Sequence, residues 1–178
     1  MLMGFTFSSV SLLVTRVSSS SEDSCQGFDY SFLASIYSVQ FLGAFAVIFT
    51  VDWIGRVNSI VLFFLISSLG IVLLGLSGGP ALFESAWLME FSGSIALAAG
   101  MGASAAVWVT TPEQYETSIR STGHTAAAAM ARIGALCSSY WVDSAVPDLW
   151  VAALLGVGCV VAASAAWTLP ERMSDKLS

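Results

Sequence analysis

Charged residues are scarce in this chain. Only six Lys or Arg and twelve Asp or Glu occur among 178 residues, a charged share of 10%, against about a quarter in an ordinary soluble domain. Apolar residues make up 56%, and the mean hydropathy is +0.81. This balance excludes a water-soluble domain and indicates an integral membrane protein in contact with lipid. With six basic residues the chain also lacks the basic surface that a nucleic-acid partner requires.

Cysteine and histidine are equally sparse, which argues against a disulfide framework, a metal site or a cofactor. Cys137 and Cys159 lie inside apolar runs, and Cys25 stands alone in a polar loop. The single histidine, His124, opens an Ala-rich run, where capping or packing is favoured over a proton relay. Because no nucleophile and base are paired, we expect no enzyme.

Long apolar runs are what the chain does contain. About 20 residues cross a hydrocarbon core of about 30 Å, and the fifth run is borderline for this length. The first run offers only about 16 residues, so it is either a clipped helix or a signal, and the absence of a preceding Lys or Arg disfavours the signal. The runs lie at roughly 2–17, 30–51, 57–77, 86–109, 124–142 and 148–169.

The basic residues predict the orientation of these runs, because Lys and Arg are retained on the cytoplasmic side. An even number of spans places both termini on one face, which would carry Arg56, Arg120, Arg172 and Lys176. The opposite face would carry only Arg16. We therefore expect a multi-pass protein with both termini on the cytoplasmic side.

Five charged residues sit at or inside the ends of the runs, where an unpaired charge is costly. Asp52 and Arg56 flank the junction of the second and third runs, and Gly55 between them permits a tight turn. Glu113 follows Pro112 at the end of the fourth run, and Arg120 precedes the fifth. Arg132 lies about two turns inside the fifth run, too deep for easy snorkelling.

Three segments together resemble the carboxy-terminal half of a major facilitator superfamily transporter. They are VDWIGR at 51–56, TPEQYETSIRSTG at 111–123 and ARIGAL at 131–136. Within the superfamily they are most similar to the branch of the synaptic-vesicle two-related proteins and the organic-ion and sugar porters. The resemblance covers most of the chain from residue 51 onward. It implies an all-α bundle of six transmembrane helices, one half of the family fold, as a single domain over 1–178.

The resemblance also implies a role for the charges, as a cytoplasmic cluster that latches the outward-open state. Two departures weaken the match: Glu116 stands where the branch usually has a proline, and Arg172 to Ser174 replace a Thr-Lys-Gly continuation after Pro170-Glu171. The residues carried over as gating charges and their turn are Asp52, Gly55, Arg56, Glu113, Arg120 and Arg132.

Polar residues inside the runs are the candidates for lining a cavity. Tyr37 and Gln40 lie in the second run and Glu90 in the fourth. Glu90 is about one turn from the non-cytoplasmic end, where snorkelling is the simpler interpretation and proton coupling the alternative.

The family implies secondary transport of a small solute, possible classes being organic ions and sugar-like molecules. Family members bind substrate between two halves, and this chain corresponds to one of them. A second half, supplied by a homodimer or another polypeptide, would therefore be needed. The alternatives are a non-transporting structural subunit of a larger membrane complex and, from the short first run at Met1, a truncated gene model.

Overall fold

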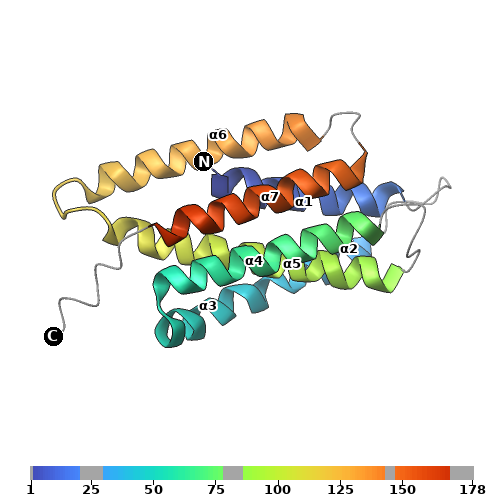
Figure 1. The fold of residues 1–178 in the computed structure, drawn as a ribbon, viewed down its shortest axis with the longest axis horizontal. Coiled ribbons are helices and arrows are strands. Elements are labelled where there is room, and N and C mark those ends of the chain that lie inside the picture. The colour runs from blue at the N-terminus through green and yellow to red at the C-terminus, as the bar shows by residue number, and fades with distance from the viewer. Residues whose placement is uncertain (1, 21–29, 78–85, 143–146, 169–178) are drawn as a thin grey trace.

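A computed structural model describes residues 2–20, 30–77, 86–142 and 147–168, which form a bundle of antiparallel helices (Figure 1). Throughout these ranges the chain is helical apart from short turns, which confirms the all-α expectation. The helices are α1 (Leu2–Ser20), α2 (Tyr30–Ser38), α3 (Gln40–Ile54), α4 (Arg56–Ser77), α5 (Ala86–Glu113), α6 (Arg120–Val142) and α7 (Asp148–Trp167).

Four helical segments of the described chain are long and apolar enough to cross a membrane, as a multi-pass membrane protein requires. Neither α1 nor α6 is among them, and these are the first and fifth runs, the two whose length the sequence left in doubt. In α6 the many Ala, Ser and Gly residues lower the hydropathy. The four segments are Ala34–Ile54, Arg56–Ser77, Trp87–Pro112 and Leu149–Trp167.

The second apolar run is bent rather than continuous, which the sequence did not predict. Val39 separates α2 from α3 but keeps helical dihedral angles, with φ −67° and ψ −19°. The Ser38 hydroxyl donates a hydrogen bond of 2.6 Å to the Ala34 carbonyl, a contact that often bends helices. The two helices therefore form one bent span that reaches Ile54, three residues beyond the expected end.

The turn between α3 and α4 is tight at Gly55, as the sequence predicted, and consists of that residue alone, so it is shorter than the expected interval between 51 and 57. The Gly55 φ of 92° and ψ of 161° lie in a region that is almost restricted to glycine. The Gly55 carbonyl accepts hydrogen bonds from the backbone N–H of Ser59 at 3.1 Å and from its hydroxyl at 2.6 Å. Gly55 thus both reverses the chain and begins α4.

The Pro-containing connection is shorter than the sequence predicted. We expected the fourth run to end near 109 and the fifth to begin at 124, whereas α5 continues to Glu113 and α6 begins at Arg120. Pro112 lies in the last turn of α5 and has no N–H to donate to the Trp108 carbonyl four residues earlier, and the helix ends one residue later at Glu113. A Cβ on Gly123 would lie 2.8 Å from the ring of Tyr115, so this glycine lets the connection pack closely on α6.

The helices pair in a pattern that has an internal two-fold character. The main pairs are α4 with α5, α4 with α7, α1 with α6, α3 with α5 and α1 with α7. Exchanging α1 with α5, α3 with α6 and α4 with α7 turns these five pairs into one another, whereas the lesser pairs α3 with α4 and α5 with α6 have no matching pair of similar extent. The exchanged helices run in opposite directions in Figure 1. Two three-helix units of inverted direction therefore build the bundle.

Glycine allows two of these helix pairs to approach closely at equivalent places. A Cβ on Gly4 of α1 would collide with the backbone of Ala131 on α6, and one on Gly43 of α3 would collide with the backbone of Ala98 on α5. The two pairs, α1 with α6 and α5 with α3, are exchanged by the internal two-fold. Small residues at a crossing let helix backbones pack closely in a membrane.

Candidate functional site

The charged residues of the turns gather at one end of the bundle. Asp52 is exposed in the last turn of α3, Arg56 is half-buried at the start of α4, and Arg120 is exposed at the start of α6. Both the α3–α4 and the α5–α6 turns lie at the left end in Figure 1. The side chain of Glu113 lies outside the described residues, so its pairing with an arginine stays a prediction.

Arg132 lies away from that end. It is twelve residues after Arg120, about 18 Å along α6, and one turn deeper than the sequence predicted because α6 begins earlier. The Arg132 side chain is exposed. Among the described side chains it forms no ion pair with Asp52. The structure therefore gathers three of the candidate gating residues and their glycine at one end and leaves Arg132 nearer the middle.

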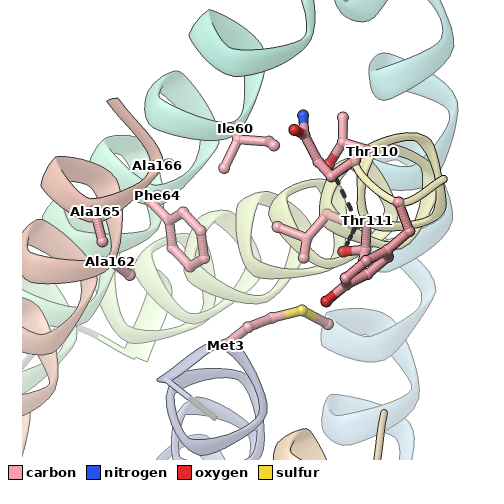
Figure 2. Close-up of a pocket in the computed structure, with 11 residues that line it drawn as sticks. Met3, Ile60, Phe64, Thr110, Thr111, Ala162, Ala165 and Ala166 are labelled. Carbon is pink, nitrogen blue, oxygen red and sulfur yellow. Dashed lines mark hydrogen bonds between the residues drawn. The ribbon is translucent and has the colours of Figure 1, made fainter. Parts of the chain in front are cut away.

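A pocket of about 480 Å³ opens at the same end as the charged turns, between the start of α1, α4, the end of α5 and α7 (Figure 2). This pocket could not be predicted from the sequence, because its walls come from four segments far apart in the chain. Thr110 and Thr111 before Pro112 were the one local signal of a polar wall. The lining residues are Met3, Ile60, Phe64, Val107, Thr110, Thr111, Gln114, Tyr115, Ala162, Ala165 and Ala166.

The chemistry of the pocket suits an uncharged, mainly apolar group. The hydroxyl of Thr110 donates to the carbonyls of Ala106 at 2.9 Å and Val107 at 3.2 Å, and that of Thr111 donates to the Val107 carbonyl at 2.6 Å. The dashed lines from Thr110 and Thr111 in Figure 2 mark the two bonds to Val107. Both hydroxyl protons are therefore used within α5. Gln114 and Tyr115 supply the remaining polar groups, and none of the lining residues is charged.

Tyr37, a candidate for lining a cavity, joins α2 to α1. Its hydroxyl is 2.8 Å from the Ser11 hydroxyl and 3.4 Å from the Thr15 hydroxyl. Nearby, the Arg16 guanidinium donates a hydrogen bond of 2.5 Å to the carbonyl of Val142, the last residue of α6. A cation at a helix carboxyl terminus is favourable because the helix dipole is negative there. These contacts hold the end of the bundle opposite the charged turns.

Glu90 and Gln40 lie on the helices that pack beside this region. The half-buried Glu90 carboxylate accepts a hydrogen bond of 2.8 Å from the Ser35 hydroxyl, which connects α5 to α2. Gln40 is half-buried at the first position of α3, directly after the bend. Neither residue, nor Tyr37, lines the pocket of Figure 2.

His124 packs against an aromatic ring near the charged end. Its ring lies edge-on to that of Trp108 on α5, with centroids 5.0 Å apart. Within the described part of the chain its Nδ1 is buried without a hydrogen-bond partner. This is the packing role that the sequence favoured. Cys25, Arg172, Lys176 and the segment 169–171 lie outside the described residues.

No protein-family model matches the sequence, and no curated protein matches it. The resemblance to major facilitator transporters therefore depends on the three sequence motifs.

Proposed function

We propose that this chain is one half of a major-facilitator-type secondary transporter for a small solute and works together with a second half. The observation that carries the proposal is the internal two-fold of the helix pairs. Each half of such a transporter is itself built from two inverted three-helix repeats. The exchange of α1, α3 and α4 with α5, α6 and α7 is the pairing that this architecture would give.

The charged turn gives separate support. The Asp-x-x-Gly-Arg motif lies where α3 turns into α4, and Gly55 adopts the positive φ that the short turn needs. Arg120 lies at the same end of the bundle, as a latch around this turn would require. In this proposal, contacts among four charged residues stabilise one state of the transporter, and the residues separate in the other state. They are Asp52, Arg56, Glu113 and Arg120.

A second half is needed because the solute path in this architecture lies between two halves, near the middle of the membrane. A single bundle lacks the opposing wall. The bundle also exposes Arg132 well inside α6, where lipid would be a poor neighbour. The missing wall and the exposed Arg132 are both expected of a chain that works within an assembly. The chain could be a transporter half or a structural subunit there.

An uptake assay separates these two roles. The tagged chain is purified alone and, in parallel, with whatever remains bound in mild detergent, and both samples are reconstituted into proteoliposomes. We expect saturable uptake of radiolabelled tetraethylammonium or glucose by the bound assembly only, with loss of uptake in the Asp52→Asn variant. An assembly without uptake of either probe would favour the structural subunit, and saturable uptake by the single chain would remove the need for a second half.

A further inference from the structure

The pocket of Figure 2 lies at one boundary of the membrane-crossing part of the bundle. The carboxyl ends of α3, α5 and α7 lie together at this end in Figure 1, and near them are Trp53, Trp108 and Trp167. These three side chains are exposed, by 39% to 89%, and tryptophan collects where hydrocarbon meets water. The lining residue Thr111 directly precedes Pro112, the last residue of the segment of α5 that can span a membrane. The pocket therefore lies beside the headgroup region.

The polar groups of this pocket are confined to one wall. Thr110, Thr111, Gln114 and Tyr115 all lie at the end of α5 or just after it. The remaining lining residues are apolar and come from α1, α4, α7 and the preceding turn of α5. A bound molecule would therefore meet hydrogen-bonding partners at one wall and apolar side chains at the others, as an amphiphile requires.

The hydrogen-bonding groups of that wall select an uncharged head. None of the lining residues is charged, so a phosphate or an ammonium group inside the pocket would have no ion-pair partner among them. The hydroxyl protons of Thr110 and Thr111 are used within α5, which leaves their oxygens as acceptors. The Gln114 amide and the Tyr115 hydroxyl can each donate and accept. A hydroxyl group, which also does both, is the head that fits this wall.

The size and position of the pocket suit part of a lipid. Its volume of about 480 Å³ is within the range of roughly 300–1,000 Å³ for pockets that bind small molecules. Ala165 lines the pocket and is exposed on α7, two residues before the end of the segment Leu149–Trp167 that can span a membrane. The pocket thus reaches the surface of the bundle at membrane depth, where a lipid can enter sideways. Thr111 is about 17 Å along α5 from the middle of its spanning segment, the depth at which a transporter holds its solute.

We infer that this pocket binds an uncharged lipid with a hydroxyl head, the chemistry shared by diacylglycerols and sterols, at a site separate from the solute path. The hydroxyl bonds to the polar wall, and the apolar part packs against Phe64 of α4 and Ala166 of α7. The rest of the lipid extends past Ala165 into the bilayer. Because the lipid touches four helices of the folded bundle, its binding also stabilises that bundle.

Photolabelling in membranes that contain the full chain tests the inference. A diacylglycerol and a sterol, each with a diazirine on its apolar part, are photolysed in separate samples, and the labelled residues are located by mass spectrometry. We expect at least one probe to label Met3 or Phe64 and to be displaced by the same lipid without the diazirine. The methyl ether of that lipid and phosphatidic acid should compete about tenfold less well, because the first lacks the hydroxyl proton and the second is charged. The probe that labels shows which of the two lipids is bound.

Variants of the opening and of the polar wall locate the site. Ala165→Phe narrows the opening and should reduce labelling about tenfold or more, whereas Ala153→Phe, at an exposed position of α7 outside the pocket, should leave it unchanged. Gln114→Leu combined with Tyr115→Phe should remove the preference for the hydroxyl lipid over its methyl ether, while the Tyr115 ring position beside Gly123 stays filled. The lipid should also raise the resistance of the wild type, but not of Ala165→Phe, to unfolding by sodium dodecyl sulfate.

Four results would overturn the inference. The first is labelling spread equally over the exposed Phe41 and Phe45 of α3, as for lipid that merely surrounds the bundle. The second is equal competition by phosphatidic acid, which uses the wild type and so needs no variant to fold. The third is labelling unchanged in Ala165→Phe, and the fourth is labelling that requires removal of residues 169–178, since this tail would then be the occupant. None of these measurements depends on solute uptake, so the lipid site and the transport proposal can fail separately.

Discussion

Replacing Gly55 by alanine tests the one-residue turn on which the charged end of the bundle depends. With φ 92° and ψ 161°, Gly55 occupies a backbone region in which any L side chain is strained. Holding alanine there costs about 1–3 kcal/mol. Relaxing the turn instead would disturb the hydrogen bonds of Ser59 to the Gly55 carbonyl. Either response lowers the free energy of unfolding.

A matched control is available in the same bundle. Gly93 lies within α5, and a Cβ there would meet only side-chain atoms of Val14 and Leu74, at 3.6–3.8 Å. Gly93→Ala should therefore leave stability unchanged or raise it by about 0.5–1 kcal/mol, because alanine is the better helix former. The two variants carry the same chemical change with opposite expected signs.

The assay is unfolding of the purified protein in mild detergent, followed by tryptophan fluorescence as sodium dodecyl sulfate is added. Gly55→Ala should unfold at a lower fraction of the denaturing detergent than the wild type, and Gly93→Ala at an equal or higher one. If Gly55→Ala lay within about 0.5 kcal/mol of the wild type, the positive φ would not be required and the reasoning would be refuted.

Three further predictions concern helix packing, hydrogen bonding and orientation. Gly43→Ala should destabilise by about 1–3 kcal/mol in the same assay, because its Cβ would collide with the Ala98 backbone, whereas Gly100→Ala has room at 3.6 Å and should not. Tyr37→Phe should lose about 0.5–1.5 kcal/mol with the hydrogen bond to Ser11, and an unchanged stability would mean that water replaces it. In a Cys137→Ser background, a membrane-impermeant maleimide added outside cells should label Cys25 but not a Ser118→Cys variant, and labelling of both would reject cytoplasmic termini.

The helices could be predicted from the sequence because their signals are local. The six apolar runs, including the short first and the borderline fifth, located the helical stretches to within a few residues, and the Asp52 to Arg56 motif located the turn. The break between α2 and α3 at Val39 was missed, since neither a proline nor a glycine marks it in the sequence. The ends of α5 and α6 were misjudged because Pro112 was expected to keep the fourth run from reaching it, whereas α5 continues through Pro112 to Glu113 and α6 begins at Arg120.

The candidate site was less predictable, because it depends on helix pairing. The pocket of Figure 2 combines Met3, Phe64, Thr110 and Ala166, which no spacing along the chain connects. Likewise, the place of Tyr37 in an apolar run predicts a residue that lines a cavity. Its role as a link to Ser11 becomes visible only once α1 and α2 are side by side.

The exposed surfaces of the bundle differ in a way that separates lipid from protein neighbours. On α3 the exposed row is Phe41, Phe45, Ile48 and Phe49, which is apolar throughout and suited to acyl chains. On α6 the exposed row carries Arg132 near its middle. Because a bilayer accepts the first surface and penalises the second, the α6 side is where an assembly would close. The low hydropathy of α6 then has a physical reason, since a helix covered by protein does not need a lipid-compatible surface.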